Sequence, residues 1–243
     1  MQTLYIMIAH QRSGHHGALN WVCTQHGNIT HMNNPKLIND GHGAQPNRPD
    51  SGYTTYGAGH DVFLNLESME LERLQHTWMK SEFIKCFDKI YYILHIRRFR
   101  NWLASTACHP GNKCMLKNPT PKMQAKWDRM IRIYHHHLEW AKDASMLPGK
   151  TVIQFDRWFA EKPYRELIAK KLGLDFTDAG LLTVPRFASG STFDKRKYDG
   201  KAQDMGVLER WKQAEDNPLY QQKMAENSYL DALSEAFFEK TVY

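Results

Sequence analysis

The sequence predicts an α/β fold in which a parallel β-sheet is covered by helices on both faces. Short apolar runs rich in β-branched and aromatic residues alternate with stretches of helical periodicity, and no internal repeat is visible. Parallel strands need crossover connections, so this alternation favours a doubly covered parallel sheet. The length of 243 residues suits one domain spanning residues 1–243.

The first expected strand, Tyr5–Ala9, ends at a polar turn, Gln11–Gly14, and an amphipathic pattern follows over about His16–Gln25. Such a strand, turn and helix expose backbone N–H groups at a helix N-terminus, where the helix dipole favours phosphate-like anions. Arg12 and Ser13 add a cation and a hydroxyl at the same point. We therefore interpret the turn as an anion-binding loop, although it lacks the glycine and lysine of the full G-x-x-x-x-G-K-[ST] pattern.

Residues 27–59 are rich in glycine, asparagine, proline, aspartate and histidine, and no period persists among them. A long loop inside a compact domain usually has a function. Because a strand is expected directly after this segment, we interpret it as a loop on the substrate side of the site and not as a linker between domains.

The remaining elements continue the alternation. Strands are expected over 62–66, 90–96 and 151–155, and the second of these is the clearest in the chain. Helices are expected over about 69–87, from 97 through 105, and over 122–144, 163–171, 204–214 and 218–237, with Gly173 as a left-handed C-cap. Residues 109–120 form an expected loop, and 186–201 are expected to be irregular.

Arg97 and Ser105 form a second candidate anion site. Arg97 follows the clearest strand, and Ser105 lies eight residues further, two turns into the next helix. Ligands of open parallel sheets bind outside the carboxyl ends of the strands, so this pair and the N-terminal turn can face one crevice. A guanidinium with a hydroxyl suits a phosphate group. The alternative is that Arg97 caps a helix or pairs with Asp88, and that Ser105 is only a small helical residue.

Together these motifs resemble the sulfotransferases that use 3′-phosphoadenosine 5′-phosphosulfate (PAPS). The resemblance implies a three-layer α/β/α fold related to P-loop nucleotide-binding proteins, PAPS as sulfuryl donor, no metal, and a small-molecule or carbohydrate acceptor. It also implies where the nucleotide binds. The implied cofactor-binding residues are Arg12, Ser13, Gly14, His15, His16 and Gly17 at the 5′-phosphosulfate, Arg97 and Ser105 at the 3′-phosphate, and Ser189, Gly190, Ser191 and Phe193 in a C-terminal loop.

The resemblance runs in order along the chain and has departures. Residues 155–159, the helix 163–174 ending in Leu-Gly-Leu, and residues 208–211 also resemble family segments. In contrast, His15-His16 stands where small hydroxyl residues are usual, Phe99 where proline is usual and Asp156 where glutamate is usual. The Lys-Ser-His strand end that carries the general base in cytosolic members is absent.

The base that takes the acceptor proton has three candidates. Glu67 follows the 62–66 strand, where the family places its base, and the alternative is that it begins the next helix. His60 precedes the same strand. His15 or His16 suits stabilisation of the transferring group better, and the alternative is that it only caps the helix. We expect Glu67, His16 and Arg12 to be the catalytic residues.

Two other functions stay open. A P-loop-type nucleotide kinase using ATP and Mg²⁺ is disfavoured because no lysine follows Gly14 and no strand-terminal aspartate is evident for the metal. A non-catalytic nucleotide-binding module would keep the fold and lack the base. The scarcity of long apolar side chains in 27–59 favours a polar acceptor.

Composition excludes several classes. The net charge of +6 is mild, and the basic residues form no stripe, so nucleic acid is not an expected partner. No apolar run approaches the roughly 20 residues of a membrane span, and no signal peptide is evident. Four cysteines without a C-x-x-C pair indicate free thiols and a cytoplasmic protein. Consecutive helical residues diverge by about 100°, so His135-His136-His137 is not expected to bind one metal ion.

Overall fold

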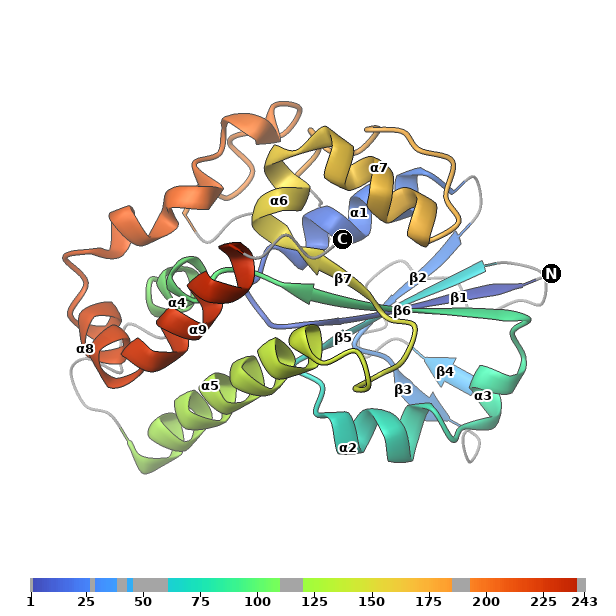
Figure 1. The fold of residues 1–243 in the computed structure, drawn as a ribbon, viewed down its shortest axis with the longest axis horizontal. Helices are drawn as coiled ribbons and strands as arrows, with labels where there is room; N and C mark the ends of the chain where they lie inside the picture. Colours follow the sequence, from blue (N-terminus) through green and yellow to red (C-terminus); the bar gives the residue numbers. More distant parts are fainter. Residues whose placement is uncertain are drawn as a thin grey trace.

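The computed structural model describes residues 2–26, 29–38, 43–45, 61–109, 120–184 and 193–239. In these residues a five-stranded parallel sheet with the order β2-β5-β1-β6-β7 lies between two layers of helices (Figure 1). The predicted fold class is therefore confirmed. The strands are β1 (Thr3–Ala9), β2 (Ile29–Asn33), β5 (Asp61–Glu67), β6 (Lys89–Ile96) and β7 (Thr151–Gln154).

Alternate residues of the central strand pack against opposite helical layers. Tyr5 and Met7 belong to a core cluster with α1 (His15–Thr24), α6 (Phe155–Ala160) and α7 (Lys162–Lys171). Leu4 and Ile6 belong to a second cluster on the opposite face. This period of two is the one that a strand buried on both faces requires.

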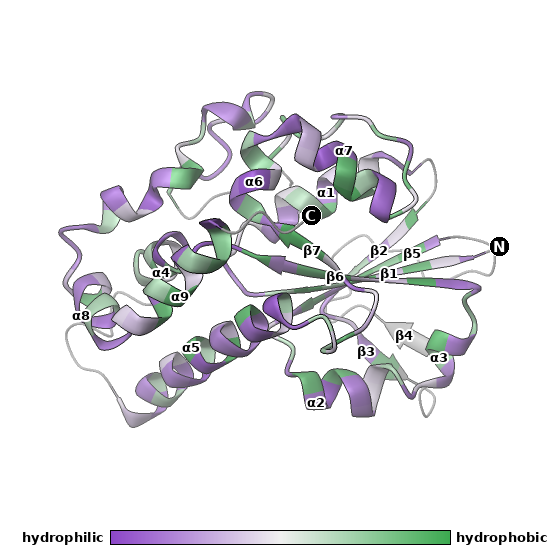
Figure 2. Cartoon of the chain, in the orientation of Figure 1, coloured by the Kyte–Doolittle hydropathy of each residue, from purple (hydrophilic) through white to green (hydrophobic). Residues whose placement is uncertain are grey.

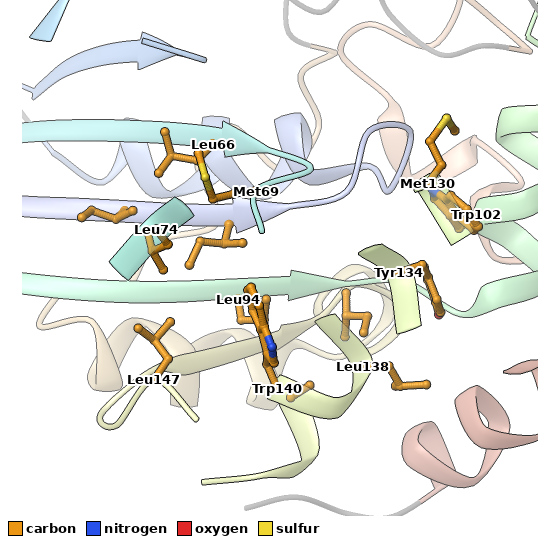
Figure 3. Close-up of a cluster of buried hydrophobic side chains, with 14 of the residues drawn as sticks. Leu66, Met69, Leu74, Leu94, Trp102, Met130, Tyr134, Leu138, Trp140 and Leu147 are labelled. Carbon is orange, nitrogen blue, oxygen red and sulfur yellow. The ribbon is translucent and has the colours of Figure 1, made fainter. Parts of the chain in front are cut away.

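The second cluster packs α5 (Pro121–Lys142) against the sheet. Figure 3 shows Leu94 of β6 and Leu66 of β5 on the sheet side of this cluster, with Tyr134, Leu138 and Trp140 coming from α5. Figure 2 shows α5 carrying hydrophilic and hydrophobic residues together, as the three- and four-residue spacing predicts for a helix with one buried side. Its start is well specified, because the Thr120 side chain accepts from the Met123 N–H and Pro121 occupies the first turn.

The strand register brings three chain segments to one edge of the sheet. Ala9, the last residue of β1, pairs with Glu67 of β5 on one side and with His95 of β6 on the other. The turn after β1, the end of β5 and the segment after β6 therefore leave the sheet beside one another. Parallel α/β folds bind their ligands at this edge.

The expectation of a plain loop over 27–59 is wrong for its first part. Residues 29–33 form β2, which pairs with β5 in parallel at the edge of the sheet. Residues 36–38 and 43–45 form a small antiparallel pair, β3 (Lys36–Ile38) and β4 (Gly43–Gln45). The signal for β2 is short, and the turn-forming Asn33-Asn34-Pro35 follows it directly. Residues 27–28, 39–42 and 46–60 lie outside the described part, so a role of this segment at the acceptor stays a prediction.

The expected continuous helix over 69–87 is also wrong. The chain forms α2 (Leu71–Arg73), a π-helical turn η3 (Leu74–Trp78) and, after a break, α3 (Glu82–Lys85). At the break the Ser81 hydroxyl donates to the Trp78 backbone oxygen over 2.7 Å. A side chain that takes over a backbone acceptor in this way competes with the regular helix.

Smaller differences occur towards the C-terminus. Phe155 begins α6 and does not end β7. The expected helix over 204–214 is a pair of 3₁₀ segments, η6 (Ala202–Asp204) and η7 (Val207–Ala214). Instead of one last helix there are two, α8 (Pro218–Glu226) and α9 (Ser228–Glu239), because the Asn227 side chain donates to the Lys223 backbone oxygen and ends the first. Gly173 has φ +66°, as expected of a C-cap.

The helices described are all too short or too polar to cross a lipid bilayer.

Candidate functional site

The turn after β1 is built around Gly14. The Ser13 N–H donates to the His10 backbone oxygen over 3.2 Å, and Gly14 then takes φ +85° as the N-cap of α1. Glycine suits this position for two reasons: its φ is left-handed, and a Cβ would lie 2.5 Å from the Phe155 ring. Gly14 offers no side chain to cap the first N–H groups of α1. The backbone here has the form of an anion-binding helix start.

Buried neighbours hold the turn in place. His10 Nε2 lies 2.8 Å from the Met130 backbone oxygen of α5, to which it donates, and Trp102 Nε1 donates to the Gln11 backbone oxygen over the same distance. The rings of His10 and Trp102 pack edge to face with centroids 4.5 Å apart. Burial lowers the pKa of His10 to about 4, so it is a neutral structural support at physiological pH.

Arg97 and Ser105 lie together, as their spacing suggested. Arg97 follows β6, Ser105 lies in α4 (Phe99–Ala107), and Arg97 Nη1 donates to Ser105 Oγ over 3.0 Å. The same nitrogen lies 3.3 Å from the backbone oxygen of Arg12, and Nη2 donates to the backbone oxygen of Val207. Burial lowers the pKa of Arg97 to about 10, so the group remains charged at neutral pH.

Among the described residues, the Nε of Arg97 has no hydrogen-bond partner. This nitrogen is buried, and the residue as a whole is 4% exposed. The guanidinium carbon lies 4.9 Å from the centre of the Phe155 ring. A buried donor without an acceptor is costly and rare in folded proteins. Within the described part of the chain, the charged Arg97 can therefore still donate from Nε to an acceptor.

Glu67 ends β5 with its carboxylate among hydrogen-bond donors. Asn34 Nδ2 and Gln11 Nε2 donate to its Oε2 over 2.9 and 3.2 Å, and its own N–H donates to Asn34 Oδ1 over 2.7 Å. Burial opposes the charge, but the contacts with His15, His16 and Asn34 outweigh it and hold the pKa of Glu67 well below its usual range. The alternative role of Glu67 at a helix start is not what is observed, because α2 begins only at Leu71.

His15 and His16, in the first turn of α1, both face Glu67. Their Nε2 atoms lie 3.0 and 3.5 Å from its Oε1, and the two ring centres are 4.0 Å apart. Ser13 Oγ lies 3.3 Å from His15 Nδ1 and 3.2 Å from Nδ1 of His95, which is buried at the end of β6. Burial and the neighbouring His15 lower the pKa values of both His16 and His95 well below the ordinary histidine value.

The other predicted residues are placed as follows. The Arg12 side chain is exposed and contacts His109 Nε2, with its backbone at φ +66°. Gly17 lies against the Trp158 ring, which a Cβ would meet at 3.4 Å. Phe193 is half-buried under the guanidinium of Arg210. Ser189, Gly190, Ser191 and the alternative base His60 lie outside the described residues.

Sequence reasoning missed three of these contacts. Gln11 and Asn34 hold the second oxygen of Glu67, and His95 contacts Ser13 from β6. His95 could have been found, because it stands two residues before Arg97 at the carboxyl end of the clearest strand. Asn34 could not, since the strand that precedes it was not predicted.

The three histidines at 135–137 diverge, as expected. His137 is buried and donates to the Met69 backbone oxygen over 2.8 Å, while His136 is exposed. Metal-ligand atoms converge elsewhere among the described residues: those of His15, His16 and Glu67 all lie within 4.8 Å of one another.

The described residues define a parallel α/β protein with a glycine turn, a buried arginine and a histidine–carboxylate cluster at the carboxyl edge of its sheet. No family model and no curated protein matches the sequence. Among solved structures the chain is similar to the crystal structure of mouse sulfotransferase SULT7A1 complexed with PAP. The TM-score is 0.42 and the sequence identity 14%, over 96% of this chain and 88% of that chain.

Proposed function

We propose that this chain, acting as one domain, is a PAPS-dependent sulfotransferase that moves a sulfuryl group to a hydroxyl or amine of a small-molecule or carbohydrate acceptor. The observation that carries the proposal is the position of Arg97, which contacts both Ser105 and the backbone of the N-terminal turn. PAPS has two separate anionic groups. Two neighbouring anion-binding elements at the carboxyl edge of a parallel sheet suit such a donor.

The nucleotide-binding roles follow from this placement. The turn and helix start, residues 12–17, would hold the 5′-phosphosulfate through backbone N–H groups and the dipole of α1. Arg97 and Ser105 would hold the 3′-phosphate, with the Arg97 Nε, which has no acceptor among the described residues, as a further donor. Ser189, Gly190, Ser191 and Phe193 remain proposed as a nucleotide-contacting segment.

The Val207 backbone oxygen accepts a hydrogen bond from Arg97 Nη2. A bound 3′-phosphate would therefore compete with this oxygen, at the start of η7, for the same donor. Asn101 Nδ2 in α4 also donates to the neighbouring Leu208 backbone oxygen over 2.7 Å. Nucleotide binding would therefore change how the start of η7 packs on α4.

The chemistry needs a group that accepts a proton and groups that stabilise the negative charge of the transferring sulfuryl group. As the acceptor oxygen forms its bond to sulfur, the bond between sulfur and the phosphate oxygen breaks, and 3′,5′-adenosine bisphosphate leaves. Glu67, ionised and at the same edge, would take the acceptor proton. Arg12 and His16 would stabilise the charge on the transferring group. If His15 or His16 is the base instead, Glu67 is the carboxylate that orients it.

Transfer of this kind is proposed to need no metal. A sulfuryl group carries less charge than a phosphoryl group, so cationic side chains, loop amides and the helix dipole can stabilise it. The kinase alternative requires ATP and Mg²⁺, and the non-catalytic module would bind nucleotide without turnover.

Nucleotide titration tests the proposal. The purified chain is titrated with 3′,5′-adenosine bisphosphate, with adenosine 5′-phosphate and with ATP–Mg²⁺ by calorimetry. We expect the bisphosphate to bind best, and Arg97→Ala to weaken it by about 2–3 kcal/mol while hardly changing the monophosphate. Arg97→Lys keeps the buried charge and serves as a second variant in case Arg97→Ala does not fold. Arg73→Ala, at an exposed position, is the matched control. Equal losses for both adenosine ligands would contradict the proposal.

A further inference from the structure

His15, His16 and Glu67, which have proposed roles in transfer and nucleotide binding, also bring three metal-ligand atoms together. Two imidazole nitrogens approach a single carboxylate oxygen, at 3.0 Å from His15 and 3.5 Å from His16. Ligands around a tetrahedral ion with bonds of about 2.1 Å lie roughly 3.4 Å apart. The two nitrogen–oxygen distances are close to this value, and all three atoms lie within 4.8 Å of one another.

The surroundings orient each donor toward the others. Glu67 Oε2 is occupied by Asn34 and Gln11, which leaves Oε1 facing the imidazoles. His15 Nδ1 lies against Ser13 Oγ, so its Nε2 is the nitrogen that points to Glu67. Metal-binding histidines and carboxylates commonly have their second atom held by such outer partners.

The cluster is sheltered yet reachable. The side chain of His15 is 2% exposed, that of Glu67 11% and that of His16 23%. The last of these opens the cluster toward the start of α1, where backbone N–H groups and Arg12 favour anions. With three protein ligands, an ion held here would keep a fourth position for another ligand.

We propose that His15 Nε2, His16 Nε2 and Glu67 Oε1 form a binding site for a divalent transition-metal ion of the zinc class. Two imidazoles and one carboxylate with an open fourth position suit Zn²⁺, Co²⁺ and related ions. Mg²⁺ and Ca²⁺ prefer all-oxygen ligands and are not expected to bind. The open position would accept water or an oxygen of an anion in the turn.

The metal site shares Glu67 and His16 with the proposed transfer, but metal binding can be tested without any transfer assay. An ion at Oε1 would occupy the carboxylate that is proposed to take the acceptor proton. The metal-bound form and the transferring form are therefore alternatives, and nucleotide recognition through Arg97 and Ser105 is measured separately from both.

Metal binding to the whole chain tests the site. The protein is stripped with a chelator, and Zn²⁺ is titrated in competition with a chromophoric chelator. We expect one ion per chain, with affinity falling at least about tenfold in His16→Ala and in Glu67→Gln. Co²⁺ should give the visible absorption of a tetrahedral complex, and Mg²⁺ should not compete.

The chain supplies a matched control. His135 also lies beside a carboxylate, with its Nε2 3.9 Å from Glu139 Oε1 on the surface of α5, so His135→Ala should leave the affinity unchanged. Circular dichroism and melting temperature verify that His16→Ala, at a partly exposed position, stays folded. Unchanged Zn²⁺ affinity in folded His16→Ala and Glu67→Gln would overturn the proposal, as would a chain that binds no Zn²⁺.

Discussion

Arg97 Nη1 lies 3.3 Å from the backbone oxygen of Arg12, so the end of β6 is joined directly to the turn that follows β1. The same nitrogen donates to Ser105 Oγ. One guanidinium thus links a strand end, a helix and the candidate anion-binding turn. The proposed contacts with the two ends of a nucleotide depend on this one link.

Replacing Ser105 tests whether its hydroxyl, which accepts from Arg97 Nη1, also contacts the 3′-phosphate. Ser105→Ala removes the hydroxyl and leaves the charge of Arg97 in place. We expect the affinity for 3′,5′-adenosine bisphosphate to fall by about 1–2 kcal/mol relative to adenosine 5′-phosphate, measured by calorimetry. Exposed Ser145→Ala is the control. An unchanged ratio of the two affinities would place the 3′-phosphate away from Ser105.

Glu67→Gln tests the proposed base. Glutamine keeps the shape and much of the hydrogen bonding but cannot take the acceptor proton. We expect the transfer rate, measured with chelator present and an identified acceptor, to fall by about 10²–10⁴-fold, with nearly unchanged nucleotide affinity. Glu70→Gln, three residues further along, should keep its activity. A near-normal rate in Glu67→Gln would instead favour His16 or His60.

Chelation separates sulfuryl transfer from phosphoryl transfer. Because no metal takes part in the proposed transfer, EDTA should leave the rate unchanged, or raise it where zinc-class ions occupy His15, His16 and Glu67. The measurement is product formation from PAPS with and without EDTA. Loss of activity in EDTA and its recovery with Mg²⁺ would favour the kinase alternative.

His137 should make the fold sensitive to acid. Burial, helped by the nearby His10 and His136, lowers its pKa from 6.5 to about 3, although its hydrogen bond to Met69 opposes the shift. Below pH 6.5 the unfolded chain therefore binds a proton that the folded chain excludes. Stability is fully present above pH 6.5 and falls as pH drops toward about 3, by at most about 1.4 kcal/mol per pH unit.

Denaturant unfolding between pH 7 and 4 measures this contribution. His137→Gln retains a donor for the Met69 oxygen and does not titrate. Unfolding of this variant should therefore take up about one proton fewer at acid pH, so its free energy of unfolding should depend less on pH. Exposed His76→Gln should leave the dependence as it is. Identical pH profiles for wild type and His137→Gln would show that His137 does not exclude the proton.

Gly14→Ala tests the packing of the turn. The left-handed φ of +85° costs alanine about 1–2 kcal/mol, and the new Cβ would meet the Phe155 ring. Gly149→Ala is a matched control, because its φ is +75° and nothing lies within 4 Å of the added atom. We expect Gly14→Ala to lose about 1–3 kcal/mol more than the control in chemical unfolding. Equal losses would mean that the ring moves aside freely.

The elements predicted well are those with strong local signals. The strand at 90–96 and the helix at 122–144 appear within a few residues as β6 and α5, because apolar periodicity marks the buried side of each. The contact between Arg97 and Ser105 was predictable because Arg97 follows a strand and Ser105 lies two helical turns further along the chain. The breaks at Ser81 and Asn227 were missed, since each depends on a side chain donating to the backbone oxygen of a residue three or four positions earlier.

The environment of Glu67 was only partly predictable. Its place at the end of a strand could be inferred from the apolar run before it. Its neighbours could not, because Asn34 arrives through the unpredicted β2 and the paired approach of His15 and His16 depends on side-chain directions in the first turn of α1. Tertiary hydrogen bonds of this kind leave no period in a sequence.

The Phe155 ring lies against both Gly14 and the guanidinium of Arg97. The two proposed anion sites therefore share one wall, and the free-energy changes of substitutions on either side of it should not add. A double-mutant cycle between Phe155→Leu and Arg97→Lys would express this as a coupling energy. A substitution at Phe155 would then change the selectivity for the 5′ group and for the 3′ group of a nucleotide at the same time. Changing the specificity of one anion site alone would therefore require this aromatic ring to be kept in place.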